Sequence, residues 1–405
     1  MMEDIPTLCS FPTGLNPDAI EYHDRSKSVL LAQYQLDEAS RRKTGQLDVL
    51  RVAGASLERA SSRPERAVFD ARWRRGAGAA ESDAGAGADA SAFSGALVAV
   101  AADGGGVSIN RLVDSSAALE RVAELQLGEA GEAAPSALYV DWLCSGGASG
   151  ASAGYVSGGS GGLVVARSDG CVSFVALDAP GGPAVAATWR AHSLGGAPIE
   201  VWVAAASPHA SGAHTVWSGG DDSMLRGWDL RALAGANAAP GAGAVSTAGC
   251  AFASHAHRAG VTAVAFHPSD EHCVATGSYD EALRVWDTRR VAAGPVGELG
   301  AMGGGVWRVR WLPGASGPRR HALLAACMLG GAHIVDASTA SGAGPRTVGH
   351  YAAHKSLVYG AEWLRGEREA DSLPPLVATC SFYERQVHLW RVPGKAWGLL
   401  HNAVI

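Results

Sequence analysis

The stretch SGGDDSMLRGWDLR, from Ser218 to Arg231, places two adjacent aspartates seven and six residues before a tryptophan. A second stretch, GSYDEALRVWDTR at 277–289, matches it at glycine, aspartate, Leu-Arg, Trp-Asp and the final arginine. A weaker third copy, CSFYERQVHLWRV, lies at 380–392. Self-similarity of this kind indicates that one supersecondary unit recurs along the chain.

Each repeated unit is expected to contain short antiparallel strands. A short apolar segment occurs at the start of the later units: VWVAAA at 201–206, VTAVAF at 261–266, VWRVRW at 306–311 and VYGAEW at 358–363. Each is followed by a loop, a second apolar run, a tight turn and a third strand that ends in tryptophan or an aliphatic residue. This order recurs about every 40 to 60 residues, which is typical of the four-stranded blades of WD-repeat propellers.

Three earlier units follow the same order less clearly and bring the number of units to seven. Their first apolar segments lie at 19–24, 67–73 and 137–142. The sequence therefore predicts an all-β fold, a single seven-bladed WD40-type β-propeller over residues 1–405 with Gly/Ala-rich loop insertions. The predicted blades span 14–55, 66–115, 134–180, 186–233, 250–292, 303–347 and 350–395.

Glycine, alanine and serine accumulate in three tracts, at about 75–95, 145–162 and 232–249. Such tracts bury too little apolar surface to order themselves, so we expect disordered loops there. Gly158–Gly162 formally matches the G-x-S-x-G nucleophile elbow. That motif requires an apolar strand before it and a helix after it, and the sequence provides neither, so we interpret the match as chance.

The composition excludes several classes of protein. Charged residues make up 18% of the chain and the net charge is −6, which argues against binding to nucleic acid. The seven cysteines contain no CxxC pair and indicate reduced thiols rather than a zinc or disulfide framework. No basic and apolar leader is visible, and no run approaches the roughly 18–20 apolar residues of a membrane span. We therefore expect a cytoplasmic monomer that binds no membrane, metal or cofactor.

One of the paired aspartates has a structural explanation. In the fifth unit we expect a buried hydrogen-bond relay of His257, Ser278, Asp280 and Trp286 that rigidifies the blade. This set resembles a catalytic Ser-His-Asp arrangement, but the repeat favours the structural role. Asp222 shares the register of Asp280 and is assigned to the scaffold, which leaves Asp221 unexplained.

Two predicted rings of positions gather aromatic side chains around Asp221 at one rim of the propeller. The first ring, one residue before the turn aspartate, contains Asp221, Tyr279 and Tyr383, with Met328 in blade six. The second ring, near the start of each first strand, contains Trp202, Thr262, Trp307 and Tyr359, with Phe69 and Leu138 in the less regular blades. Aromatics around a carboxylate select a quaternary ammonium group. The alternative is that these rings pack beneath loops.

Several of these motifs are rare in ordinary WD repeats. The segments SGGDDSMLRGWDLR, GGVWRVRW, SLVYGAEW and ATCSFYERQVHLW, with YQLDEASRRKTGQL near the N-terminus, occur in order between Leu31 and Val392. Together they resemble the diphthine methyl ester hydrolase family (diphthine methylesterase, formerly diphthine methyltransferase), the WD-repeat proteins of diphthamide biosynthesis. The resemblance is strongest from Trp189 onward.

The resemblance implies an enzyme that hydrolyses the methyl ester of methylated diphthine on translation elongation factor 2, which is both substrate and partner. The products are diphthine and methanol, and no cofactor is required. The trimethylammonium group of that substrate fits the rim residues Trp202, Trp307, Tyr279, Tyr359, Tyr383 and Asp221. The competing hypothesis is a non-catalytic scaffold that binds a protein or peptide at the same face.

Ester hydrolysis needs an activated water or nucleophile and a donor for the oxyanion. The candidate bases are Asp221, His354 and His192. His354 occupies the register of His257, with Glu384 in place of aspartate and Phe382 at the serine position, so we expect a degraded relay. Its imidazole is either free for other work or a structural histidine at the entry of its blade, and His192 leaves the same two interpretations open. Arg308 either stabilises the oxyanion or points outward from its strand. Cys327 is interpreted as a buried thiol of the core.

Overall fold

The computed structural model describes residues 3–74, 95–113, 116–128, 134–143, 161–233, 245–315, 317, 321–339, 344–365 and 373–401. Residues 75–94, 145–160 and 234–244, which are most of the three Gly/Ala-rich tracts, lie outside this description. The Gly158–Gly162 match also lies largely outside it. Within the described part of the chain, no helix is both long enough and apolar enough to cross a bilayer.

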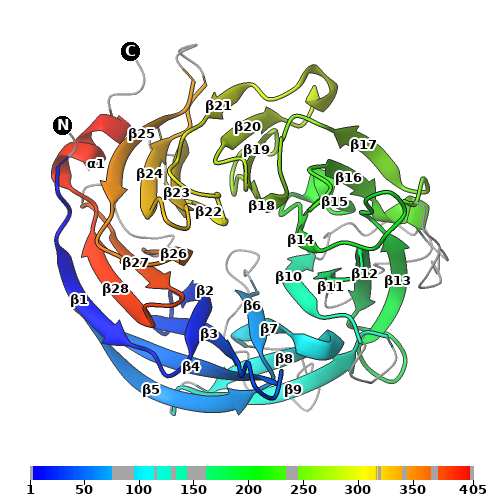
Figure 1. Ribbon diagram of the computed structural model, residues 1–405, viewed down its shortest axis with the longest axis horizontal. Coiled ribbons are helices and arrows are strands. Elements are labelled where there is room, and N and C mark those ends of the chain that lie inside the picture. The colour runs from blue at the N-terminus through cyan, green and yellow to red at the C-terminus, as the bar shows by residue number, and fades with distance from the viewer. Residues whose placement is uncertain are drawn as a thin grey trace.

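The described strands form seven four-stranded antiparallel sheets arranged radially around a central axis (Figure 1). The fold prediction of a seven-bladed propeller is therefore confirmed. The first strand of each blade lies nearest the axis. Blades one to three contain β2 (Asn16–His23), β3 (Ser28–Leu36), β4 (Lys43–Ala53), β5 (Ser56–Glu65); β6 (Val68–Trp73), β7 (Leu97–Ala102), β8 (Gly106–Val113), β9 (Ala118–Gln126); β10 (Ala137–Leu143), β11 (Gly162–Arg167), β12 (Cys171–Ala176) and β13 (Ala184–Arg190).

The remaining blades follow the same order. They contain β14 (Val201–Ala206), β15 (Thr215–Gly220), β16 (Leu225–Asp229), β17 (Cys250–Ser254); β18 (Val261–Phe266), β19 (Cys273–Ser278), β20 (Leu283–Asp287), β21 (Gly297–Leu299); β22 (Arg308–Trp311), β23 (Ala322–Ala326), β24 (Ala332–Asp336), β25 (Arg346–Tyr351); β26 (Val358–Leu364), β27 (Leu376–Ser381) and β28 (Gln386–Arg391).

The N-terminal strand closes the ring. Strand β1 (Thr7–Pro12) pairs antiparallel with β28 and so becomes the outer strand of blade seven. The hydroxyl groups of Thr7 and Tyr351 form a hydrogen bond of 2.6 Å, which ties β1 to the outer strand of blade six. Helix α1 (Gly394–His401) packs against β25 beside this closure and buries Trp397 and Leu400 (Figure 1). Closure by the first strand removes the exposed edge that β28 would otherwise present.

The blades extend one strand beyond most of the predicted boundaries. Predicted blade one ended at residue 55, whereas its outer strand β5 continues to Glu65, and blade two continues through β9 to Gln126. The outer strands are difficult to recognise because they are only partly buried and carry no regular apolar alternation, as in β5. Inner strands such as β6 and β14 are almost entirely buried because neighbouring blades cover both faces.

Candidate functional site

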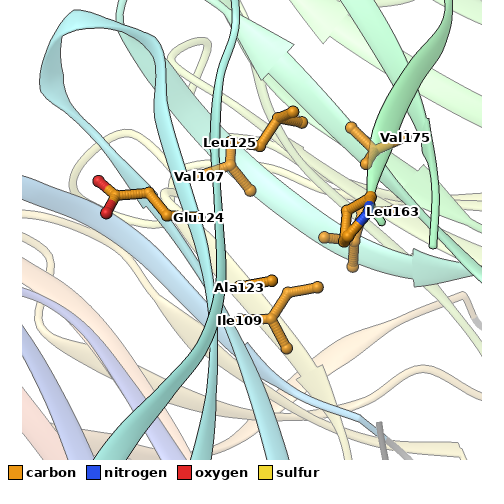
Figure 2. A pocket seen from close by; sticks show the side chains of 8 residues that line it. Val107, Ile109, Ala123, Glu124, Leu125, Leu163 and Val175 are labelled. Carbon is orange, nitrogen blue, oxygen red and sulfur yellow. The ribbon is translucent and has the colours of Figure 1, made fainter. Parts of the chain in front are cut away.

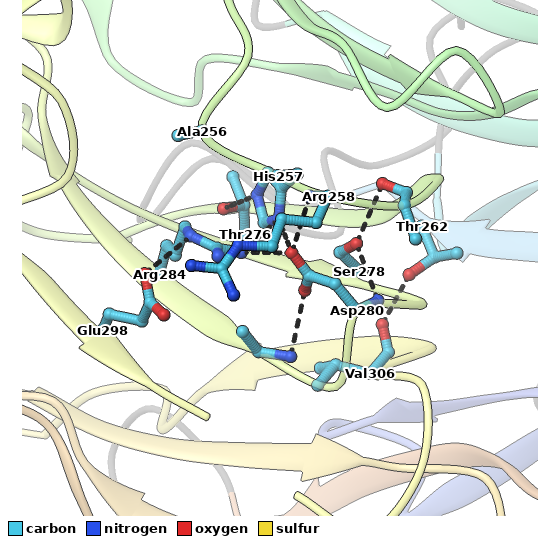
Figure 3. Close-up of polar contacts among 12 residues, drawn as sticks. Ala256, His257, Arg258, Thr262, Thr276, Ser278, Asp280, Arg284, Glu298 and Val306 are labelled. Atoms are coloured by element: carbon cyan, nitrogen blue, oxygen red, sulfur yellow. Dashed lines mark hydrogen bonds and ion pairs between the residues drawn. The ribbon is translucent and has the colours of Figure 1, made fainter. Parts of the chain in front are cut away.

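A buried relay fixes blade five, but its membership differs from the prediction (Figure 3). His257 Nε2 lies 2.8 Å from Thr276 Oγ1, which also accepts a 2.8 Å hydrogen bond from Trp286 Nε1. Arg284 Nη1 donates both to His257 Nδ1 and to Asp280. His257 Nδ1 also lies 3.5 Å from Asp280, so both ring nitrogens are engaged within the blade. Burial lowers the pKa of His257, in agreement with a neutral ring.

Ser278 is therefore not a member of this relay, which corrects the sequence assignment. Its hydroxyl donates to the Ala259 carbonyl at 3.0 Å and accepts the Asp280 amide at 3.1 Å. Side chains two residues apart share one face of a strand, so Thr276 and Ser278 both fit the alternation. The Trp286 indole donates to Thr276 and not to Ser278.

The same relay recurs in blade four and accounts for His192. The ring of His192 is fully buried, with Nδ1 2.7 Å from Asp222 and Nε2 2.7 Å from Ser218. Trp228 Nε1 also donates to Ser218 Oγ. Burial alone would raise the pKa of Asp222, but hydrogen bonds from His192 and Arg226 more than offset it, and the pKa lies below its usual value. Both nitrogens of His192 are engaged, so it is not a candidate base.

Blade seven contains a third intact relay, so the expectation of a degraded relay is wrong and His354 is the structural histidine of its blade. Its Nδ1 lies 3.0 Å from Glu384 and its Nε2 2.9 Å from Thr379, which also accepts the Trp390 indole N–H. Thr379, and not Phe382, takes the hydroxyl position. Burial, and then the neighbouring His388, lowers the pKa of His354 to about 4. Ligand atoms of His354, Glu384 and His388 lie within 4.8 Å of one another, but the relay already uses both nitrogens of His354.

The first strands share a local irregularity that aims one side chain each at the rim. The register shifts at the second residue of five of these strands and at the third residue, Asp18, of β2, while Trp307 directly precedes the seventh strand. Bulges of this kind redirect a side chain away from the regular pleat. We call these equivalent residues the rim ring: Asp18, Phe69, Leu138, Trp202, Thr262, Trp307 and Tyr359.

Aromatic side chains from this ring and from the adjoining turns form a contiguous group, which we call the aromatic cluster: the half-buried Trp202, Tyr279, Trp307 and Tyr359, and the buried Phe382. The Trp307 ring centroid lies 5.5 Å from that of Trp202, 5.9 Å from Tyr279 and 4.9 Å from Tyr359. Phe382 continues the cluster from Tyr359, at 5.1 Å. The rings therefore contact one another and also form part of the surface, so packing and recognition are both compatible with the arrangement.

Tyr383 lies outside this cluster. It is 69% exposed and touches the edge of Phe382 at 5.0 Å, whereas Phe382 is buried and contacts Tyr359. The turn of blade seven contains one residue more between its strand and its acid, Glu384, than the turn that contains Asp222. The extra residue places Phe382 at the position that the sequence assigned to Tyr383.

Asp221 is exposed and lies beside the cluster. Trp202 Nε1 donates a 2.6 Å hydrogen bond to its Oδ1. Gly260 permits this approach, because a Cβ atom there would lie 2.6 Å from Asp221 Oδ1 and 3.0 Å from the Tyr279 ring. The two features that the sequence associated, a spare carboxylate and a tryptophan, are therefore in direct contact.

Below the rim ring, an ion-pair network crosses the axis between blades. Arg308 Nη2 lies 3.0 Å from Asp70 Oδ1, and its guanidinium lies over the Tyr139 ring at 5.4 Å. Arg308 therefore points inward and not to the outside of its strand. The network continues through further hydrogen-bonded pairs from the inner strands: Asp70–Arg72, Arg72–Glu21, Glu21–Arg310 and Arg310–Glu362. It joins blades one, two, six and seven.

Two buried donors at this level lack a hydrogen-bond partner among the described residues: Trp307 Nε1 and Arg308 Nε. Buried N–H groups are normally satisfied, so such a pair is compatible with a site for an acceptor. Cys327 offers no competing nucleophile, because it is fully buried and burial raises the pKa of its thiol well above the usual value.

Asp18, the rim-ring residue of blade one, was not singled out from the sequence. Its side chain is buried, with 4% of its area exposed, and no hydrogen bond to its carboxylate is found among the described residues. Burial raises the pKa of Asp18 to about 7, with Arg308 lowering it and Asp70 raising it. Asp18 also contributes, after burial, to the raised pKa values of Tyr34, Tyr279 and Tyr359, so the carboxyl lies close to the aromatic cluster.

A small apolar hollow lies elsewhere, between the outer parts of blades two and three (Figure 2). Its lining comes from β8, β9, β11 and β12, with Val107, Ile109, Leu125, Leu163 and Val175 around it. Glu124 at its edge is already paired with Arg121. The hollow provides no convergent polar groups and is better explained as imperfect packing between two blades.

Comparison with known proteins gives one family match and several relatives. The family described as "WD domain, G-beta repeat" matches residues 249–287, which contain β17 of blade four and the first three strands of blade five. The chain is 32% identical over 212 residues to "Diphthine methyltransferase homolog" of Dictyostelium discoideum, covering 50% of this chain and 51% of that protein. It is 37% identical over 180 residues to "Diphthine methyltransferase" of Mus musculus, covering 44% of this chain and 32% of that protein.

These matches confirm the resemblance predicted from the sequence. They cover about half of the Dictyostelium relative and about a third of the mouse relative. A solved structure, "Crystal Structure of Mitotic Checkpoint Complex", superposes with a TM-score of 0.63 at 15% identity, covering 97% of this chain and 93% of that chain. At that identity the similarity shows the propeller fold alone.

Proposed function

We propose that this chain, a WD-repeat relative of the diphthine methyltransferases, hydrolyses the methyl ester of methylated diphthine on translation elongation factor 2. The products are diphthine and methanol, and the reaction is a step of diphthamide biosynthesis in the cytoplasm. The observation that carries the proposal is the aromatic cluster with Asp221 at its edge. The proposed substrate carries a trimethylammonium group near its ester, which is the kind of cation that such clusters bind.

The electrostatics of the rim favour a cationic ligand. After burial, the raised pKa of Tyr279 is caused by its neighbours, including Asp221, Asp18 and Glu200. The cation that influences the protonation of Asp18, Arg308, is paired with Asp70 below the ring. A quaternary ammonium group placed against Trp202 and Trp307 would gain cation–π attraction of about 0.5–2 kcal/mol per ring and a nearby counter-charge.

The surrounding face offers contacts for a protein substrate. Each first strand begins at the rim ring, so the turns between second and third strands and the connections between blades lie at the same end of the propeller. Three exposed apolar side chains occur in these loops: Leu194, Leu329 and Tyr383, with exposures of 63%, 74% and 69%. Exposed apolar groups around a site are typical of protein recognition.

The test is mass spectrometry of elongation factor 2 that carries the methyl-ester intermediate, after incubation with this purified protein alone. The proposal predicts loss of the mass of one methylene group and release of methanol. An unchanged mass with retained binding would contradict hydrolysis and support the alternative, a non-catalytic scaffold that docks the factor at the same face.

A further inference from the structure

We infer that Asp18 is the general base of the ester hydrolysis, taking a proton from the water that attacks the ester carbonyl. The inference rests on the proposed function and names the residue that performs its chemical step. It addresses a gap, because both histidines that the sequence offered as bases, His192 and His354, have their ring nitrogens engaged within the scaffold.

The position of Asp18 follows from the regularity of the propeller. It lies at the bulge between Pro17 and Ala19 in β2, the same place that presents Trp202 in β14 and Tyr359 in β26. Strand β2 lies next to β26, so Asp18 is the immediate ring neighbour of Tyr359. The rim ring therefore contains a single carboxyl group, and that group adjoins the aromatic cluster.

The surroundings keep the carboxyl available. It is 4% exposed, and the described residues make no hydrogen bond to it, which is unusual for a buried carboxylate. The charged groups that influence its protonation are Arg308 and Asp70, and Asp18 itself helps, after burial, to raise the pKa values of Tyr34, Tyr279, Tyr359 and Cys380. Only Arg308 is cationic, and it is paired with Asp70. A pKa of about 7 for Asp18 suits a base that works near neutral pH.

The chemical step balances without any further reactant. The Asp18 carboxylate accepts a proton from water while the water oxygen bonds to the ester carbonyl carbon, and the carbonyl oxygen becomes an oxyanion. The unpartnered Trp307 Nε1–H and Arg308 Nε–H are the donors that we assign to this oxyanion. The bond from the carbonyl carbon to the methoxy oxygen then breaks, and methanol leaves with the proton that Asp18 held. Water and ester are consumed, and acid and methanol are formed.

The experiment measures hydrolysis of the methyl ester on elongation factor 2 from about pH 5 to about pH 9 by the wild-type protein, Asp18→Asn and Asp18→Glu. We expect the wild-type rate to rise through the pKa of Asp18. Asp18→Asn should lower kcat by about a hundredfold or more, with KM little changed, and should abolish that rise. Asp18→Glu should retain a rise at a shifted pH.

Asp48→Asn is the matched control, because Asp48 is also buried in blade one but is paired with Arg59 at 3.2 Å away from the rim ring. It should keep the wild-type pH profile. If the wild-type protein hydrolyses the ester and Asp18→Asn retains both its rate and its profile, the inference is wrong while the proposed function stands. If the wild-type protein does not hydrolyse the ester, the proposed function fails and the inference with it. Should Asp18→Asn not fold, the profile of Asp18→Glu decides: an unshifted profile contradicts the inference.

Discussion

Substitution of Asp18 by asparagine should stabilise the protein at alkaline pH, since the wild-type chain must keep a buried, poorly compensated carboxyl group. Burial raises the pKa of Asp18 from 3.8 to about 7. A carboxyl whose pKa is higher in the folded than in the unfolded state contributes its full stability below the unfolded pKa. That contribution is lost as the pH rises through the folded pKa.

The magnitude follows from the difference between the two pKa values. The raised pKa corresponds to about three powers of ten in the acid dissociation constant, each worth about 1.4 kcal/mol. The ionised carboxyl therefore lowers the free energy of unfolding of the wild-type protein by about 4 kcal/mol at pH 8. At pH 5 the loss is about 1.5 kcal/mol. Asp18→Asn has a similar shape and no such loss, so its advantage should grow by about 2–3 kcal/mol between these pH values.

Urea unfolding at the two pH values would measure the free energy of unfolding of Asp18→Asn relative to the wild-type protein. Asp48→Asn is the control, and it is expected to lower that free energy rather than raise it. Asp48 is paired with Arg59, so its substitution leaves a charge without its partner and should destabilise the fold. A difference between Asp18→Asn and the wild-type protein that does not change with pH would refute the argument that Asp18 is a buried carboxyl with a raised pKa.

Three other predictions follow from the geometry. Thr276→Val should destabilise the protein by about 2–4 kcal/mol, because His257 and Trp286 both lose the hydroxyl that they contact. Ser278→Ala should cost only about 1 kcal/mol. Equal losses in denaturant titrations would restore Ser278 to the relay. Asp221→Asn should raise the KM for the trimethylammonium substrate by about three- to tenfold with kcat less affected. Trp307→Leu should raise KM similarly and should also lower kcat, because the oxyanion loses a donor; unchanged steady-state kinetics in both variants would argue for packing alone. Deletion of residues 3–12 should lower the thermal midpoint of unfolding and promote association through the uncovered edge of β28. Calorimetry would measure the midpoint and light scattering the association. An unaltered midpoint would contradict the closure by β1.

The repeats made the architecture predictable, because blades four, five and seven each carry a Trp six residues after a turn acid. The same regularity identified Trp202, Trp307 and Tyr359 as one ring before any coordinates were known. Errors arose where two positions satisfy one pattern. Thr276 and Ser278 share a strand face, and Phe382 and Tyr383 compete for one turn position, so only side-chain contacts distinguish them.

Asp18 was missed for a local reason. Asn16, Pro17 and Asp18 are typical turn residues, so the first strand was predicted to begin at Ala19. In the structure β2 already begins at Asn16, and the bulge gives Asp18 a rim position. Phe69, Trp307 and Tyr359 each lie four residues before a tryptophan, and the same count back from Tyr22 would have found Asp18. Its burial and its lack of a partner depend on the neighbouring blades, which no local pattern describes.

The most direct test of the central claim is a single turnover of the methyl ester on elongation factor 2 in water enriched in the heavy oxygen isotope. Attack of water on the carbonyl carbon predicts one heavy oxygen in the diphthine carboxyl, none in the released methanol, and none in Asp18 or any other side chain of this protein. Label in the methanol would mean that the methyl carbon is attacked instead. Label in Asp18 would mean that its carboxylate is a nucleophile and not a base, and either result would contradict the account.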